Sequence, residues 1–264
     1  MMEFFDSHSH YNDEKFNEDL EEIIKSTYEN GVTKFICAGY DLESSKKSLE
    51  ISKKYEFIYS ICGISPNDVP EKQEEIGEKL KLLEELIINN IESKKIVAIG
   101  EIGLDYYWNK ENKEIQKEMF VKQIELANKY NLPIVIHCRE AVDDIIDILK
   151  NICTVKEKGV FHCCPLNREL VKQALNLDFY ISFAGPITFK NSKNAEEIVG
   201  MVSLDKILVE TDSPYLAPEP VRGTRNNSKN VKYIAEKIAQ IKNIDLEKVA
   251  FETYNNAKKI FKIN

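Results

Sequence analysis

The 264-residue sequence has few arginines, few histidines and no long apolar run. No stretch approaches the roughly 18 consecutive apolar residues that a membrane-spanning helix needs. Its first residues, MMEFFDSHSHYND, contain neither the basic region nor the apolar stretch of a secretory signal. From these absences we expect a cytoplasmic protein that has no membrane partner.

Paired cysteines are also missing, since none of the six cysteines stands in a CxxC spacing. Most of them lie inside apolar runs, which is typical of reduced, buried residues in a cytoplasmic protein. A structural zinc site of the cysteine type is therefore not expected. The six are Cys37, Cys62, Cys138, Cys153, Cys163 and Cys164.

No linker rich in Gly, Ser or Pro and no internal repeat divides the chain. We therefore expect a single metal-dependent hydrolase domain over residues 1–264. A chain of this length buries most of its unfolded surface, so it folds without a structural metal. Any metal is then expected to serve chemistry.

The net charge of −8 argues weakly against broad binding to duplex nucleic acid, but it leaves room for a local site. Only four residues are arginines: Arg139, Arg168, Arg222 and Arg225. They either mark positions that need a planar bidentate donor, or are too few to form a pattern.

Short apolar runs alternate with longer charged segments whose apolar residues are spaced three and four apart. This alternation predicts a parallel (β/α)8 TIM-type barrel, with a doubly wound open sheet as the competing α/β fold. The predicted strands are 4–8, 34–38, 58–63, 96–101, 134–137, 159–162, 179–183 and 207–210. The clearest predicted helices are 12–29, 42–54, 71–90, 113–130 and 141–151, and two more are expected within 229–264.

All four histidines follow or end a predicted strand: His8, His10, His137 and His162. In a barrel of this kind, reactive residues occupy the carboxyl ends of the strands. A lone histidine is more often structural, but four of four at strand ends argue against that interpretation. Glu101 and Asp212 stand at two further strand ends.

These six residues supply nitrogen and oxygen ligands without thiolate, which favours divalent Zn, Mg or Mn. Six ligands are too many for one tetrahedral ion but suit two ions about 3.5–4 Å apart, which together activate a hydroxide. Glu101 can bridge the ions, and Asp212 can also accept a proton. Two divalent ions outweigh these two carboxylates, so an anionic substrate is expected.

Several motifs occur in order along nearly the whole chain. They are Asp6-Ser7-His8-Ser9-His10, Gly100-Glu101-Ile102-Gly103-Leu104-Asp105-Tyr106, His137-Cys138-Arg139, His162-Cys163, Glu210-Thr211-Asp212-Ser213-Pro214-Tyr215-Leu216 and Arg222-Gly223-Thr224-Arg225-Asn226. In these motifs the sequence resembles the TatD-type metal-dependent deoxyribonucleases of the amidohydrolase superfamily. The resemblance implies that His8, His10 and Asp212 serve one metal, that His137 and His162 serve the second, and that Glu101 bridges them.

The resemblance also implies phosphodiester hydrolysis on DNA, but the sequence departs from the family at two positions. Ser65 stands where the family commonly has a histidine, and it cannot carry positive charge or act as an imidazole acid. After the sixth strand, Cys164-Pro165-Leu166 replaces the usual Phe-Ser-Gly. We therefore expect the substrate-facing loops to differ while the metal set stays whole.

The predicted reaction is an in-line displacement at phosphorus, with Glu101 and Asp212 as catalytic residues. We expect single-stranded DNA ends as the substrate, exonucleolytic cleavage, and a monomer with no obligate protein partner. The candidate substrate contacts are Ser65, Tyr106, Arg139, Arg222 and Arg225. For the arginines and for the run Tyr106-Tyr107-Trp108, which could stack on an unpaired base, packing at the barrel rim is the alternative.

Two other functions remain open from the sequence. The same two-metal hydroxide can attack a carboxylic ester or amide, such as the ester of an aminoacyl-tRNA, because metals do not dictate the electrophile. A noncatalytic metal-binding protein is the third possibility, and it predicts no cleavage of any substrate.

Overall fold

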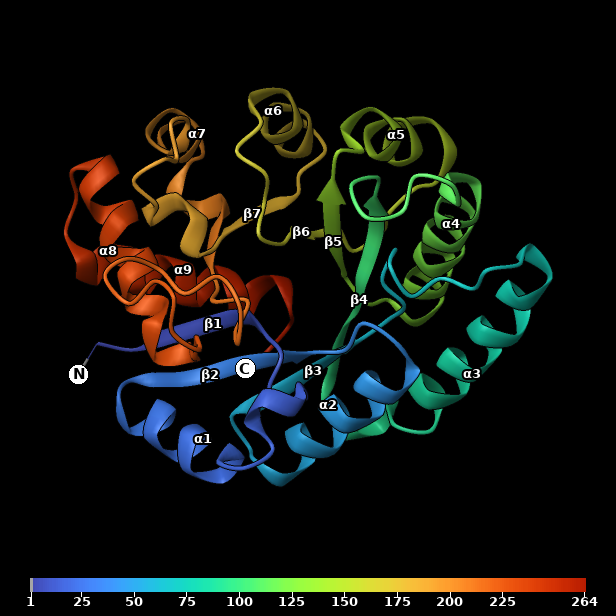
Figure 1. Cartoon of the computed structure of the whole chain (residues 1–264), viewed down its shortest axis with the longest axis horizontal. Coiled ribbons are helices and arrows are strands. Elements are labelled where there is room, and N and C mark those ends of the chain that lie inside the picture. Colours follow the sequence, from blue (N-terminus) through green and yellow to red (C-terminus); the bar gives the residue numbers. More distant parts are fainter. Residues whose placement is uncertain (1) are drawn as a thin grey trace.

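The computed structural model describes residues 2–264, which form a ring of eight parallel strands with helices outside it (Figure 1). Each strand pairs with the next along the chain, in the order β1-β2-β3-β4-β5-β6-β7-β8. The predicted (β/α)8 barrel is confirmed. The strands are β1 (Phe4–Ser9), β2 (Val32–Ala38), β3 (Ile58–Cys62), β4 (Ile96–Asp105), β5 (Ile134–Arg139), β6 (Gly159–Phe161), β7 (Tyr180–Phe183) and β8 (Ile207–Val209).

The ring closes between β1 and the segment that follows β8. The backbone N–H of His10 donates to Ser213 O at 2.7 Å, and that of Asp212 donates to His8 O at 3.0 Å. Deeper in the barrel, the Ser7 hydroxyl donates to Val209 O at 3.0 Å. Closure therefore brings the first and last strand ends together.

Helices cover the outside of the ring, with the apolar face of each against the strands. Two of the predicted helices, α2 and α4, have the bounds expected from the sequence, and Asp41 and Ser44 form a capping box at the start of α2. The α-helices are α1 (Leu20–Glu29), α2 (Leu42–Lys54), α3 (Ile76–Ile88), α4 (Lys113–Tyr130), α5 (Val142–Asp147), α6 (Arg168–Asn176), α7 (Ala195–Met201), α8 (Val231–Lys242) and α9 (Leu246–Ile260).

Strand β4 is longer than predicted, because it continues past Glu101 to Asp105. Its register against β5 shifts between Ile99 and Ile102, and regular pairing resumes from Ile102 to Asp105. An irregularity of this kind redirects a side chain within a strand. Glu101 therefore lies at a break in the ladder, and a second carboxylate, Asp105, stands four residues further on the same strand.

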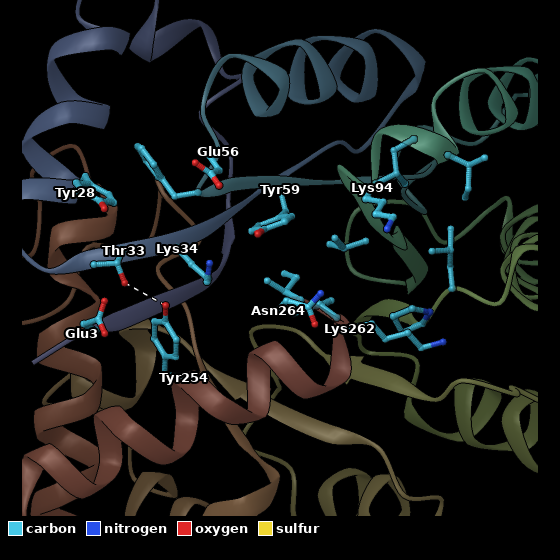
Figure 2. A pocket seen from close by; sticks show the side chains of 18 of the residues that line it. Glu3, Tyr28, Thr33, Lys34, Glu56, Tyr59, Lys94, Tyr254, Lys262 and Asn264 are labelled. Atoms are coloured by element: carbon cyan, nitrogen blue, oxygen red, sulfur yellow. Dashed lines mark hydrogen bonds between the residues drawn. The ribbon is translucent and has the colours of Figure 1, made fainter.

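A cavity of about 670 Å³ opens at the amino-terminal ends of the strands (Figure 2). Lys34, Tyr59 and Lys94 line it, and the hydroxyls of Thr33 and Tyr254 lie 3.2 Å apart at one side. None of the described residues in its lining is a histidine. The predicted ligands therefore lie at the other end of the barrel, where strands of this fold present reactive residues.

Within residues 2–264, no helix combines the length and the apolar character needed to cross a bilayer. All six cysteines are free; four are buried, whereas Cys153 and Cys163 are partly exposed. The prediction of one domain over residues 1–264 is compatible with the single ring of strands and stays a prediction.

We expect Gly159→Ala to destabilise the barrel. A Cβ at this position would lie 1.9 Å from Ile134 O on the neighbouring strand, and backbone cannot yield as a side chain can. Overpacking of this kind costs about 1–3 kcal/mol, measurable as a lower free energy of unfolding in urea. Gly77→Ala in α3 is the control, because its Cβ meets nothing within 4 Å. Removing glycine there should stabilise by about 0.4–1 kcal/mol, and equal losses for both variants would contradict the steric argument.

Candidate metal centre

The six predicted ligands converge at the carboxyl end of the barrel. His8 and Glu101 lie within strands β1 and β4, and His137 lies in β5. The other three, His10, His162 and Asp212, follow strands β1, β6 and β8. His8 is fully buried and Glu101 is 8% exposed, so most of the cluster is withdrawn from water.

Three side chains, His8, His10 and Asp212, form a first group on the side of Glu101 Oε2. His8 Nε2 lies 3.5 Å from Glu101 Oε2, and His10 Nε2 lies 4.0 Å from the same oxygen. Asp212 Oδ1 is 3.2 Å from His10 Nε2 and 3.9 Å from His8 Nε2. The two imidazole nitrogens themselves are 3.2 Å apart.

A second group gathers around the other oxygen of Glu101. His137 Nδ1 lies 2.8 Å from Glu101 Oε1, and His162 Nε2 lies 3.1 Å from it. These two nitrogens are 3.3 Å apart. Glu101 therefore presents one oxygen to each group, which is the arrangement of a bridging carboxylate.

The chemistry of this donor set fits divalent cations. Imidazole nitrogens and carboxylate oxygens gather here in two groups of three that share Glu101, one with His8 and His10 and the other with His137 and His162. Cys163 and Cys164 also line the cavity, but among the described residues no cysteine joins these groups. Nitrogen and oxygen ligands without thiolate suit Zn, Mg or Mn.

Both carboxylates are held in their ionised form. Burial would raise the pKa of Glu101, but the surrounding imidazoles of His162, His137 and His8 outweigh it and hold that pKa well below its usual range. Burial likewise opposes ionisation of Asp212, yet its hydrogen bond and charge interaction with His10 lower the pKa to about 2. Neither carboxylate needs to lose a proton near neutral pH to bind a cation.

Three acceptors behind the ligands fix the orientation of their rings. His137 Nε2 lies 3.0 Å from Asp105 Oδ2, so its Nδ1 is the nitrogen that faces the cluster. His10 Nδ1 lies 3.0 Å from the carbonyl oxygen of Ala38, and His162 Nδ1 lies 3.4 Å from Glu210 Oε1. Such partners set the tautomer of a ligating imidazole and raise its basicity.

No role was predicted for Asp105 from the sequence, although a signal for it was present. Glu101 and Asp105 stand four positions apart on one strand, and an even offset places both side chains on the same face. The predicted end of the strand at Glu101 hid this relation.

The loop after β3 contributes a different residue from the one expected. Ser65 is buried, and its hydroxyl donates to Asp68 Oδ2 at 2.6 Å. It does not line the second cavity, which opens over the predicted ligands at the carboxyl end of the barrel and is called the carboxyl-end cavity below. Asn67 lines that cavity in its place. Tyr106 is also buried, with its hydroxyl donating to Asp144 Oδ2 at 2.6 Å outside the cavity lining.

Of the three arginines predicted to contact substrate, only Arg139 lines this cavity. Arg225 is ion-paired with Asp19. The Arg222 guanidinium lies 4.1 Å from the centre of the Phe189 ring. The structure therefore places Arg139 in the same cavity as the predicted ligands, and Arg222 and Arg225 outside its lining.

The carboxyl-end cavity has a volume of about 830 Å³, within the range of small-molecule sites. Its floor carries five of the six predicted ligands, all except His8. The walls are mostly apolar and come from loops after several strands: Trp108, Pro165, Leu166, Pro186, Ile187 and Leu216.

Comparison with known proteins extends over the whole barrel. A family model described as TatD related DNase matches residues 5–262. The metal-dependent hydrolase YabD of Bacillus subtilis is 42% identical, with 98% of this chain and 99% of that protein covered. The metal-dependent hydrolase YcfH of Escherichia coli is 31% identical, with 100% of this chain and 97% of that protein covered. Both relatives carry the description uncharacterized.

Solved structures share the fold. The TatD homologue YjjV of Escherichia coli superposes with a TM-score of 0.91 at 23% identity, covering 99% of this chain and 98% of that one. A phosphotriesterase homology protein of Escherichia coli, whose structure holds phosphate in the active site, superposes with a TM-score of 0.73 at 14% identity, covering 98% and 99%.

We expect Asp105→Asn to weaken metal binding about 10- to 100-fold, because the amide cannot support the basicity of His137 as the carboxylate does. The measurement is a titration of metal-free protein against a chelator of known affinity. Asp144→Asn is the matched control, since that side chain contacts Tyr106 and Lys117 but no predicted ligand. Equal metal affinity in both variants would contradict the orienting role of Asp105.

Proposed function

The chain belongs to the TatD-related DNase family and is a metal-dependent hydrolase, and from this premise we propose that it hydrolyses phosphodiester bonds of DNA. The observation that carries the proposal is the position of Glu101, whose two oxygens each face a separate group of imidazole nitrogens. A carboxylate shared in this way suits two divalent ions, the arrangement used to hydrolyse phosphodiesters in many nucleases.

His8, His10 and Asp212 would hold one ion, His137 and His162 the other, and Glu101 both. Ions bound there would supply Lewis acidity, polarising the phosphoryl group and lowering the pKa of water toward neutrality.

Asp212 is the residue best suited to accept the proton of the attacking water. It lines the cavity, and its carboxylate stands beside His10 at the floor. Its Oδ1 lies within ion-pair distance of His8 and His10. Among the described residues, Oδ2 makes no such contact with a histidine. A positioned carboxylate of this kind contributes about 10²- to 10⁴-fold to a rate.

The cavity also favours single-stranded ends over the interior of a duplex. Four of the six predicted ligands are buried, and five of the six line the floor of a recess. A phosphate within a rigid duplex cannot descend into such a recess, whereas a terminal nucleotide can. We therefore propose exonucleolytic action. We also propose that the protein is a monomer and that it is cytoplasmic, a location that the free cysteines support.

The proposal is tested by restoring Mg, Mn or Zn to metal-free protein and measuring cleavage of labelled single-stranded and duplex oligonucleotides, with ester substrates in parallel. We expect the single-stranded oligonucleotide to be cleaved fastest and to shorten from one end. Asp212→Asn and Glu101→Gln should each lower kcat by about 10²-fold or more.

Two substitutions far from the predicted ligands are the matched controls, because they make the same chemical changes, Asp to Asn and Glu to Gln. Asp19→Asn and Glu197→Gln remove surface carboxylates that pair with Arg225 and Arg168. Since surface ion pairs contribute little, both variants should retain activity. Activity that survives both Asp212→Asn and Glu101→Gln would overturn the site assignment. Turnover of esters alone would replace the nuclease proposal with an ester hydrolase.

A further inference from the structure

One wall of the carboxyl-end cavity carries the chain's single tryptophan. Trp108 follows β4 and leaves 68% of its surface exposed, although burial of so large an apolar surface is normally favourable. Its neighbour Tyr107 is 46% exposed but does not line the cavity. An exposed aromatic face beside a polar floor is therefore available to a ligand.

The position of this aromatic turn is tied directly to the metal centre. Asp105 Oδ1 accepts the backbone N–H groups of Tyr107 at 2.9 Å and Trp108 at 3.1 Å. The other oxygen of the same carboxylate lies 3.0 Å from His137 Nε2. Because one fully buried carboxylate holds both, the distance between Trp108 and the metal ligands is fixed by a short, rigid connection.

A positive charge without a carboxylate partner stands beside Trp108. Arg139 follows His137 by two residues on β5, and its guanidinium lies 3.8 Å from the Tyr107 ring centre and 5.4 Å from that of Trp108. Across residues 2–264, the ion pairs of arginine involve Arg168 and Arg225, not Arg139. Its hydrogen-bond donors are therefore free for an anion, and a guanidinium suits phosphate.

The facing wall comes from loops on the other side of the barrel mouth. Pro165 and Leu166 follow β6, Pro186 follows β7, and Leu216 follows β8, which is diametrically opposite β4 in an eight-membered ring. These side chains are apolar and offer few hydrogen bonds to the edges of a planar ring. They favour contact with its surface and are tolerant of which ring is bound.

We propose that Trp108 and Arg139 form a nucleotide subsite, in which the indole stacks on one unpaired base and the guanidinium binds the phosphate next to it. The proposal rests on the proposed nuclease function, which it deepens. A base within a duplex offers no free face, so the subsite selects single-stranded ends and does so with little base preference.

The single tryptophan provides a signal that is independent of catalysis. We would titrate metal-loaded protein with a phosphorothioate-linked thymidine dinucleotide, which resists hydrolysis, and record Trp108 fluorescence against free N-acetyltryptophanamide as the inner-filter control. We expect saturable quenching by the dinucleotide, weaker binding of thymidine, which lacks the phosphate, and no quenching by inorganic phosphate.

Variants then separate the two contacts. Trp108→Ala should raise the KM for a single-stranded oligonucleotide about 5- to 150-fold, the range expected for loss of one stacked base, and Trp108→Phe should restore most of it. Arg139→Gln should weaken the dinucleotide but not thymidine in the fluorescence titration. Phe251→Ala, an equally exposed aromatic on α9, is the control for loss of a surface ring and should leave KM unchanged.

The outcomes distinguish this proposal from the nuclease proposal. Quenching by the dinucleotide without cleavage of any oligonucleotide would keep the subsite and overturn the nuclease function. Cleavage by wild type with no quenching, and with an unchanged KM in Trp108→Ala, would keep the nuclease and overturn the subsite. Quenching by thymidine and dinucleotide with equal affinity would overturn the role of Arg139.

Discussion

The site depends on one buried carboxylate that is shared between two groups of imidazoles. Glu101 is nearly excluded from water, and an isolated charge there would be costly. Its two oxygens face nitrogens of His8 and His10 on one side and of His137 and His162 on the other. The register shift of β4 against β5 turns Glu101 to this position. Strands from both halves of the barrel must therefore be in place before the charge is compensated.

Closure of the ring between β1 and the segment after β8 positions the remaining carboxylate, Asp212. The Asp6 carboxylate on β1 accepts hydrogen bonds from the Thr211 backbone at 2.9 Å and from its hydroxyl at 2.5 Å. These bonds join the first strand to the segment after the last one, next to the backbone bonds from His10 to Ser213 and from Asp212 to His8. Asp212 can face His10 only because this seam is closed. Barrel stability and assembly of the ligand set are thus parts of the same event.

Asp105 extends the constraint outward, from the ligands to the wall of the cavity. One of its oxygens faces His137, and the other accepts from the turn that carries Trp108. In a (β/α)8 barrel the strands hold the chemistry while the following loops vary the substrate. Here a single carboxylate at the end of β4 connects the two. The apolar Pro165-Leu166 segment after β6 belongs to the facing wall, and its side chains contact surfaces instead of making hydrogen bonds.

Local properties of the sequence determined the fold of this protein and the convergence of its histidines. The alternation of apolar runs with amphipathic segments predicts the barrel, because each pattern reflects the period of one element. The placement of His8, His10, His137 and His162 at strand ends predicts their convergence, because parallel strands present their carboxyl ends at one edge. Which side chains line the cavity was decided only by the tertiary structure. Ser65 and Tyr106 turn to carboxylates at Asp68 and Asp144, and Arg225 pairs with Asp19. These carboxylates are remote from the motifs or give no periodic signal. Which side chain pairs with which carboxylate is therefore determined only when the chain is folded.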